Sequence, residues 1–425
     1  MGKPTGDLQA GVAKVNITPP VGCYLQGYTR GKPSVGVRDD LYAKALVLDD
    51  GKTQLAIATV DLVGLEYSSI GAIRNHTEEL AGIPGENVMV AASHTHAGPV
   101  VMALGGDPWD EDYVREIEKK IVGAVYVAAN TRRPVEVGVW TGEVSFNINR
   151  RVRTLRGTQM LPNPKGPVDR RVRVVRIDDG SPVPYAVLVH YTCHATVFDG
   201  GNLRISGDYP GATQRFVEHA YGPDTTCLFA QGCCGNVRPN VVTPEGLFRG
   251  GDDLELERIG RTLGSEAVNA CEQIQTKTVE EIGVHSKIVD LPYGKPLPDR
   301  EFQELLAQKT YAPWREITLE RKKKGKTEME VQVMQVGDLR IVGLPGEVFV
   351  EIGEQIETRI GGEVLVVGYA NGNLGYLCTA RSYKEKGYEP WTSFQGYHHP
   401  TRFRPETEDL ILDTVGAVWG IICPS

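Results

Sequence analysis

The sequence lacks the features that mark several special classes of protein. Its eight cysteines in 425 residues are too few for a disulfide scaffold, and no two have the Cys-x-x-Cys spacing of a zinc ligand pair. No apolar stretch approaches the roughly 18 residues that a membrane-spanning helix needs, and the N-terminus has no apolar segment like that of a secretory signal. We therefore expect reduced cysteines, no transmembrane segment and, unless a signal has been removed, a cytoplasmic location by default.

Positively charged residues are fewer than negatively charged ones. The formal net charge is -8 and the isoelectric point is about 5.7, so the chain lacks the basic face that neutralises nucleic-acid phosphates. We expect no nucleic-acid partner, and the oligomeric state stays open. The one basic run, from Arg321 to Lys326, is expected to be a solvated helix end followed by a turn.

Apolar segments of strand length alternate with helical patterns along most of the chain, which is typical of an α/β protein. Six runs are expected to be buried strands: 41–50, 53–65, 87–94, 184–194, 339–347 and 363–372. Residues 110–129 and 253–275 are expected to be helices, and a third helix should begin with Asp208 as its N-cap and Pro210 in its first turn. We predict mixed, largely buried β-sheets flanked by helices, in one domain of residues 1–425.

Two regions have no regular pattern. Residues 144–170 are rich in Arg, Asn and Pro, and a long irregular loop inside a compact domain is often a functional lid. Residues 380–405 contain several aromatic side chains, which either line a pocket or pack at the surface.

Histidines follow two of the expected strands. In "AASHTHAGPV", His94 and His96 are two residues apart, and in an extended segment both would point to the same side. His190 and His194 follow another strand, at the kind of strand end where open α/β sheets bind ligands. Either set could form part of a metal site, or could be solvated or core histidines.

Two further segments place polar side chains directly after turns. In "VGLPGEVFVE", Glu347 follows Pro345 and Gly346, where it could be a metal ligand or a residue favoured at a helix N-terminus. In "GYANGNLGYLCT", glycine-containing turns precede or follow Tyr369 and Tyr376.

Taken together, these motifs resemble the catalytic domain of the neutral/alkaline non-lysosomal ceramidases, zinc amidases that release a fatty acid from ceramide. The resemblance covers most of the chain and includes "ASHTHAGP", "NINR", "HATVFDGGNLRISGDYPG", "FAQGCCGNVRP", "LPGE" and "GYANGNLGYLCT", in the family's order and spacing. It implies a ceramidase-type catalytic domain without the C-terminal β-sandwich that accompanies it in ceramidases.

The resemblance also implies roles for individual residues. The zinc ligands would be His94, His194, Glu347 and Tyr376, a set of nitrogen and oxygen donors that leaves a position for water. His96 would orient the water or move a proton. Arg150, from "NINR", would hold a developing oxyanion or an anionic group of the substrate.

One departure from the family lies in "CGNVRP". Ceramidases have an active-site serine where this chain has Arg238, and an aspartate where it has Asn236. An arginine cannot act as the nucleophile, but it can bind carboxylate, phosphate or sugar oxygens. We therefore include Arg238 among the active-site residues and expect a changed substrate pocket.

These observations predict a zinc-dependent hydrolase that cleaves an N-acyl amide bond with a metal-activated water. The substrate is either a ceramide or a soluble polar amide, ester or glycosidic compound. The alternatives are a non-catalytic binding protein that has kept the zinc pocket, and a protein whose histidines are structural and bind no metal.

Overall fold

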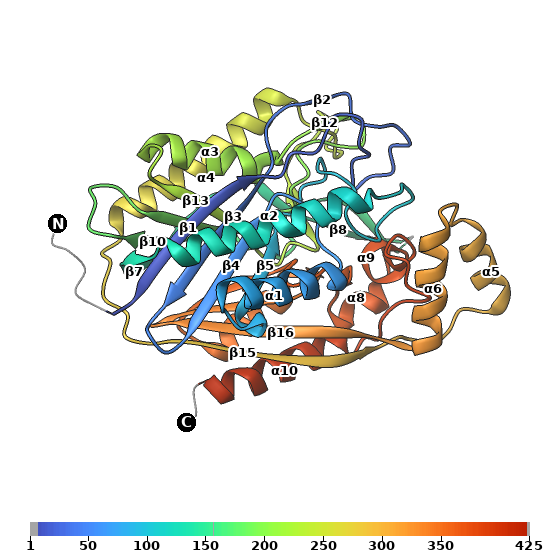
Figure 1. Cartoon of the computed structure of the whole chain (residues 1–425). Helices are drawn as coiled ribbons and strands as arrows, with labels where there is room; N and C mark the ends of the chain where they lie inside the picture. Colours follow the sequence, from blue (N-terminus) through green and yellow to red (C-terminus); the bar gives the residue numbers. More distant parts are fainter. Residues whose placement is uncertain (1–6, 156, 423–425) are drawn as a thin grey trace.

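The computed structural model describes residues 7–155 and 157–422, which form three large β-sheets flanked by helices (Figure 1). The predicted fold class, mixed sheets flanked by helices, is confirmed. The first sheet, in the order β5-β4-β3-β1-β6, comprises β1 (Gln9–Asn16), β3 (Tyr42–Asp49), β4 (Gln54–Val60), β5 (Val88–Ala92) and β6 (Arg133–Pro134). The second, in the order β13-β11-β10-β7, comprises β7 (Glu136–Glu143), β10 (Arg171–Asp178), β11 (Ala186–Tyr191) and β13 (Thr226–Gln231). The third, in the order β15-β16-β17-β19, comprises β15 (Ile282–Pro292), β16 (Lys326–Val336), β17 (Leu339–Gly343) and β19 (Glu363–Val367).

The three large sheets share one topology. In each, three successive antiparallel strands are followed by a helix and then by a fourth strand that lies parallel to the third. The crossover helices are α1 (Tyr67–Ala81), α3 (Asp208–Tyr221) and α7 (Val350–Ile360). A further helix follows each fourth strand: α2 (Glu111–Asn130), α4 (Asp253–Gln273) and α10 (Thr407–Ile422). The sequence shows no internal repeat, so the repetition exists in the topology alone.

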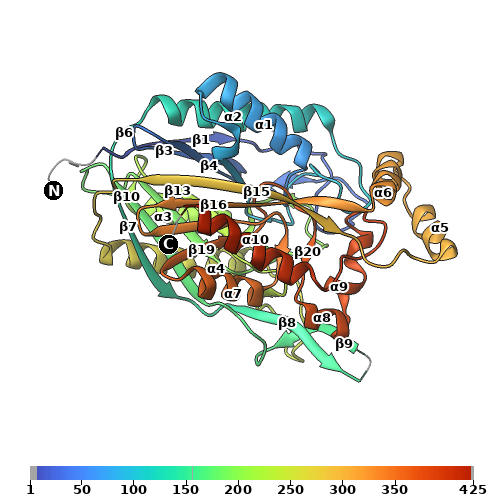
Figure 2. The ribbon, with the colours of Figure 1, turned by 90° about the horizontal axis from the view of Figure 1, so that it is seen from below.

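The sheets turn their inner faces to one shared core and their outer faces to the helices. In β4, Leu55 and Ile57 belong to the shared core, whereas Ala56 and Ala58 pack with the helix side. Figure 2 shows α1 and α2 lying on the outer side of the first sheet. Both faces of β4, β5, β11 and β13 are buried, so their sequences are almost continuously apolar rather than alternating.

The ends of the fourth strands meet at one place in the molecule. The backbone N–H of Ala92, the last residue of β5, donates to Tyr369, after β19, over 3.1 Å, and that of Gly368 donates to Gln231 of β13 over 2.9 Å. The Gln231 side chain donates to the Ser93 carbonyl over 3.1 Å. These bonds join the three sheets at the end where the loops with the candidate residues begin.

The smaller elements lie around these sheets. They are the 3-10 helices η1 (Gly85–Asn87) and η2 (Ser393–Gln395), the strand pairs β2 (Gly36–Val37) with β12 (Arg204–Ile205) and β18 (Glu347–Val348) with β20 (Tyr376–Leu377), and the helices α5 (Asp299–Ala307), α6 (Ala312–Lys324), α8 (Ala380–Glu385) and α9 (Tyr388–Trp391). Helices α5 and α6 connect β15 to β16 and project at one end of the molecule (Figure 1).

The prediction of an irregular loop over 144–170 is wrong. This region contains β8 (Asn147–Thr154) and β9 (Gly157–Asn163), an antiparallel hairpin to which β14 (Val237–Pro239) adds a third strand. Its polar composition concealed the strands, because β8 buries polar side chains such as Arg150 and Arg151 against Glu389 and therefore shows no apolar alternation. Residues 380–405 include the short helices α8 and α9, joined by irregular segments.

The predicted helices are confirmed as α2, α3 and α4, with one correction at an end. Gly207 is the N-cap of α3 and Asp208 is its first residue. Asp208 has a positive φ of 52°, and its carboxylate accepts hydrogen bonds from the backbone N–H groups of Val197 and Phe198 in the loop after β11 as well as from Tyr209 in the first turn of the helix. The basic run ends α6, with Gly325 in the left-handed conformation that terminates a helix.

Two further observations concern membrane-spanning helices and the cysteines. Within residues 7–155 and 157–422, no helix combines the length and apolar character needed to cross a membrane. The adjacent Cys233 and Cys234 are buried free thiols.

Candidate metal centre

His94 and His96 lie in the loop after β5. The loop is not extended as predicted, because His94 has a left-handed backbone with a φ of 62°. The backbone N–H groups of Ser93 and His94 donate to Val60 and Leu62, each over 2.9 Å, and so hold the loop against the end of β4. The Nε2 atoms of the two histidines are nevertheless 3.1 Å apart, so both imidazoles share one site.

His194, in the loop after β11, faces the same point, with its ring centre 4.9 Å from that of His94. The Nδ1 atoms of His94 and His194 each lie 2.6 Å from a backbone carbonyl oxygen, of Val63 and Cys234 respectively. A carbonyl can only accept, so we assign the proton to Nδ1 in both rings, which leaves the Nε2 lone pairs free. Burial lowers the pKa of His194 to about 4, so this imidazole is neutral at pH 7.

Glu347 brings a carboxylate to these nitrogens. Its Oε2 atom lies 2.8 Å from Nε2 of His194 and 3.5 Å from Nε2 of His94. No hydrogen-bond donor in the described part of the chain reaches Oε2, because the ring protons are on the other nitrogens. Three electron-rich atoms therefore face one another in a buried place, an arrangement that a bound cation would stabilise.

Tyr376 lies beside Glu347 because β18 and β20 pair in parallel with these two residues opposite each other. The Tyr376 hydroxyl accepts a hydrogen bond of 2.8 Å from Nη2 of Arg150. Burial raises the pKa of Tyr376, and the guanidinium of Arg150 opposes that rise. The structure thus brings together His94, His194, Glu347 and Tyr376, the four residues that the family resemblance implied as zinc ligands.

Arg150 is held from three sides. Its Nε donates to Glu389 over 3.0 Å and its Nη2 to the Gly235 carbonyl over 2.7 Å, while Nη1 lies 3.4 Å from Nε2 of His194. Ion pairing with the buried Glu389 fixes the guanidinium beside the cluster. Arg150 can therefore donate to an oxygen that binds near Tyr376.

His96 is the least enclosed of the three imidazoles. It is partly exposed, and its Nδ1 atom has no hydrogen-bond partner among the residues that the structure describes. Its ring packs edge-on against Tyr28 at 4.9 Å. Burial of the ring and repulsion by His94 and His194 lower the pKa of His96, so it is a neutral base at pH 7.

Three residues that the sequence interpretation left without a role complete the surroundings. Tyr397 donates its hydroxyl to Oε1 of Glu347. Tyr369, which has a φ of 54°, stacks on His94 at 4.0 Å. Glu389 holds Arg150. The aromatic content of 380–405 was the only signal for Tyr397, and nothing in its local pattern indicated that it contacts Glu347.

His190 does not belong to the cluster. Its Nε2 atom lies 3.0 Å from the carbonyl oxygen of Val366, and burial lowers its pKa to about 4. It is a buried core histidine, one of the two readings that the sequence allowed.

The donor set fits a metal ion such as zinc. One nitrogen from each of His94, His96 and His194 lies within 4.8 Å of the others. Imidazole nitrogens together with carboxylate and phenol oxygens are ligands of the kind that zinc takes in catalytic sites. The orphaned Oε2 atom of Glu347 at the centre of the set is the strongest structural indication of a bound cation.

The two residues that depart from the family pattern also lie close by. Asn236 bridges two segments, since its side chain donates to Glu351 over 2.7 Å and accepts from the Val350 backbone over 3.0 Å. Arg238, in β14, is 8% exposed and lies near Thr196, whose carbonyl is 3.5 Å from Nη2.

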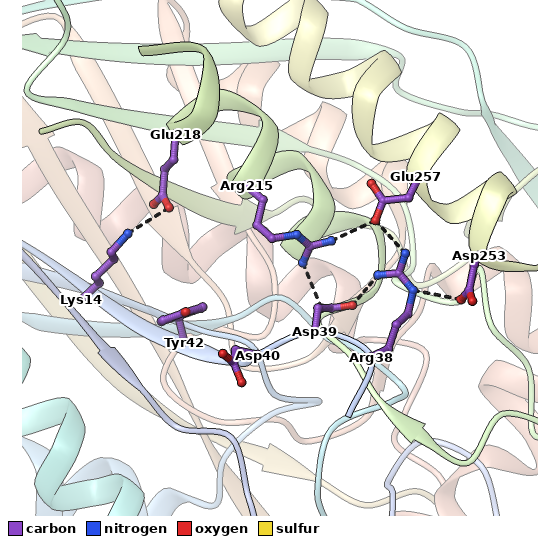
Figure 3. Close-up of a pocket in the computed structure, with 9 residues that line it drawn as sticks. All are labelled: Lys14, Arg38, Asp39, Asp40, Tyr42, Arg215, Glu218, Asp253 and Glu257. Carbon is purple, nitrogen blue, oxygen red and sulfur yellow. Dashed lines mark hydrogen bonds and ion pairs between the residues drawn. The ribbon is translucent and has the colours of Figure 1, made fainter. Parts of the chain in front are cut away.

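A pocket of about 450 Å³ lies elsewhere (Figure 3). It is lined by Lys14, Arg38, Asp39, Asp40, Tyr42, Arg215, Glu218, Asp253 and Glu257, none of which belongs to the histidine cluster. Its arginines are ion-paired: Arg38 contacts Asp39, Asp253 and Glu257, and Arg215 contacts Asp39 and Glu257. Because these charges satisfy one another, the network connects the segment before β3 to α3 and α4 and needs no ligand.

A family model matches part of this chain. The model of the neutral/alkaline non-lysosomal ceramidases, N-terminal region, matches residues 8–252, more than half of the sequence. This stretch contains both histidine loops, the β8–β9 hairpin and Arg238.

Individual relatives extend the similarity. The neutral ceramidase of Mycobacterium tuberculosis is 23% identical over 88% of this chain and 72% of its own length. That of Pseudomonas aeruginosa is 23% identical over 87% of this chain and 67% of its own length. The crystal structure of neutral ceramidase from Pseudomonas aeruginosa has the same fold, with a TM-score of 0.77 at 19% identity over 99% of this chain and 75% of that one.

Proposed function

This chain belongs to the neutral/alkaline non-lysosomal ceramidase family, and from that premise we propose that it is a zinc-dependent hydrolase that cleaves an N-acyl amide bond with an activated water. The observation that supports this most directly is the convergence of two Nε2 lone pairs and the unpaired Oε2 atom of Glu347. Ceramide, the substrate in the names of the relatives, is the first candidate.

The residues proposed to hold zinc are His94, His194, Glu347 and Tyr376. When bound, zinc supplies a Lewis acid for the scissile carbonyl and lowers the pKa of a water toward about 7. The hydrogen bonds from Nδ1 of both histidines to backbone carbonyls orient the rings and keep them in the tautomer that binds a metal.

His96 is proposed to move the proton. It is a neutral base whose Nε2 atom lies 3.1 Å from Nε2 of His94, so it lies next to the place where the water would be activated. His96 accepts the proton of the attacking water at Nε2 and returns it to the nitrogen of the leaving amine.

Arg150 is proposed to stabilise the negative charge that develops on the carbonyl oxygen. Its guanidinium is already oriented by Glu389 and the Gly235 carbonyl, so little reorganisation is needed when the charge forms. Its bond to the Tyr376 hydroxyl also favours the ionised form of a phenol ligand.

The test combines metal analysis with hydrolysis. We expect about one zinc ion per chain in the purified protein, and release of fatty acid from a fluorescent short-chain ceramide or another N-acyl amide that stops when a chelator is added. His94→Ala and Glu347→Ala should lose both metal and activity. Glu79→Ala, which removes an exposed carboxylate on α1, is the matched control and should keep both.

Two results would contradict the proposal. Full zinc content in Glu347→Ala would exclude this ligand set. Stoichiometric zinc without hydrolysis of any amide would favour a non-catalytic zinc-binding protein.

A further inference from the structure

Arg238 differs from the other buried arginines in having no carboxylate partner. Five arginines of the described chain are buried, and four of them are ion-paired: Arg150 and Arg151 with Glu389, Arg173 with Asp169 and Glu357, and Arg176 with Asp178. Within residues 7–155 and 157–422, no carboxylate lies within 4.0 Å of the Arg238 guanidinium. Burying an unpaired charge is costly, so such a group usually has a binding role or a missing partner.

The remaining contacts of Arg238 do not neutralise its charge. Nη2 lies 3.5 Å from the Thr196 carbonyl, at the limit of a hydrogen bond, and Nε has no acceptor among the described residues. The guanidinium lies 4.4 Å from the centre of the Phe248 ring. This aromatic face holds the planar group in place while its N–H edge keeps unused donors.

Arg238 lies next to the histidine cluster. It follows Val237, whose carbonyl is 3.1 Å from Nδ1 of His194, and its contact residue Thr196 is two positions after His194. The strand β14 therefore has two roles. The carbonyl of Val237 orients the His194 ring, and the next residue along the strand is Arg238. Tyr28, whose hydroxyl interacts electrostatically with Arg238 and Arg150, packs against His96 on the same side.

A second cation near Tyr28 strengthens the positive potential. Arg30 lies 5.4 Å from the centre of the Tyr28 ring, and its Nη2 donates to the His96 carbonyl over 2.7 Å. Its hydrogen-bond partners within the described chain are backbone carbonyls, which do not cancel its charge. Asp199, the carboxylate that acts on both Arg30 and Arg238, is exposed and accepts a 2.8 Å bond from Gly201.

We propose that Arg238 binds an anionic oxygen group of the substrate, so that the enzyme acts on N-acyl compounds with a carboxylate close to the amide, such as N-acyl amino acids. This inference rests on the proposed function. A guanidinium matches a carboxylate with two parallel hydrogen bonds, and its position beside the His194 loop places the carboxylate near the scissile bond. The amine released from a ceramide has hydroxyl groups and no negative charge, so it would leave Arg238 unpaired.

The test measures binding with a ligand that cannot be hydrolysed. The probe is the ketone isostere of N-nonanoylglycine, with a methylene in place of the amide N–H, and its neutral analogue has a hydroxymethyl group in place of the carboxylate. Titration calorimetry should show the acid binding to the purified protein at least about 10-fold more tightly than the alcohol. Arg238→Gln should weaken binding of the acid by about 10- to 100-fold and leave binding of the alcohol nearly unchanged.

Two further variants make the result specific. Arg249→Gln removes an arginine that is ion-paired with Glu255 on the same segment, and it should bind both ligands like the original protein. Arg238→Lys keeps the charge but loses the paired donors, so we expect a smaller loss of acid binding, which is measurable even if Arg238→Gln does not fold.

The outcomes separate this inference from the proposed function. Equal binding of acid and alcohol, or equal loss of both in Arg238→Gln, would overturn the role of Arg238 even if amides are hydrolysed. Binding of the acid that depends on Arg238, together with no metal-dependent cleavage of N-nonanoylglycine, the ceramide or any other N-acyl amide tested, would support the anion site and refute the hydrolase.

Discussion

Replacing Tyr397 by phenylalanine tests whether Glu347 is a metal ligand whose carboxylate is held in place by the Tyr397 hydroxyl. Tyr397 is 3% exposed and donates its hydroxyl to Oε1 of Glu347, while Oε2 faces the histidines. Removing the hydroxyl leaves Oε1 buried without a donor and frees the carboxylate to rotate. The ring itself, which packs against Tyr376, remains in place.

The expected loss can be estimated from the type of bond that is removed. A hydrogen bond to a charged acceptor contributes about 1.5–3 kcal/mol, and loss of a residue that orients a metal ligand typically lowers metal affinity by about 10- to 100-fold. We therefore expect the dissociation constant for zinc to rise by about 10- to 100-fold in Tyr397→Phe.

The assay is a competition titration of metal-depleted protein with a zinc-binding dye. Tyr293→Phe is the matched control, because the Tyr293 hydroxyl is also buried and bonded, to Nδ1 of His399 over 2.8 Å, but does not contact the cluster. An unchanged zinc affinity in Tyr397→Phe, or an equal loss in Tyr293→Phe, would refute the reasoning.

Three further predictions concern the metal, His96 and Asp208. Chelation should lower the unfolding temperature, and added zinc should restore it, because a ligand that binds only the folded state stabilises it; no shift in a thermal scan would argue against the site. Gly27→Ala should lower kcat and retain zinc, because a Cβ atom there would lie 2.3 Å from Cγ of His96, whereas Gly31→Ala, also at a positive φ but with open space, should keep its activity; equal kcat values in steady-state assays would contradict this. Burial raises the pKa of Asp208 from 3.8 to about 6, so its ionisation opposes folding as the pH rises through this range. The difference in unfolding free energy between the original protein and Asp208→Asn should therefore fall by up to about 3 kcal/mol between pH 4 and pH 7 in urea titrations, and a constant difference would contradict the assigned burial effect.

Local sequence patterns predicted the elements that have a strong hydrophobic signal. The apolar runs became the buried strands β3, β4, β5, β11, β17 and β19, the three- and four-residue spacing predicted α2, and a helical pattern was also expected for the residues of α4. The hairpin of β8 and β9 was missed because its polar residues show no alternation, although it contains Arg150 and pairs with the strand of Arg238. The N-cap was predicted at Asp208 but lies at Gly207, and the Asp208 carboxylate joins the loop at Val197 and Phe198 to the first turn of the helix, which local sequence does not show.

The candidate ligands were likewise accessible from the sequence, but their supporting contacts were not. The motifs around His94, His194, Glu347 and Tyr376 indicated these residues through their resemblance to a family. Tyr397 and Glu389 had no such signal, because their roles arise from contacts with residues far away in the chain.

By itself, the sequence determined the type of the elements that have a strong hydrophobic signal and the residue types available for chemistry, since hydrophobic periodicity and turn residues act over a few positions. Only the tertiary structure decided that three sheets of equal topology meet at the ends of their last strands. It also decided that the four candidate ligands, His94, His194, Glu347 and Tyr376, converge there. It also left Arg238 buried beside this cluster with no carboxylate partner among the residues that the structure describes, which depends on what every other segment places nearby. The physical reason is that burial, electrostatics and metal geometry depend on distances in space, which local sequence patterns do not contain.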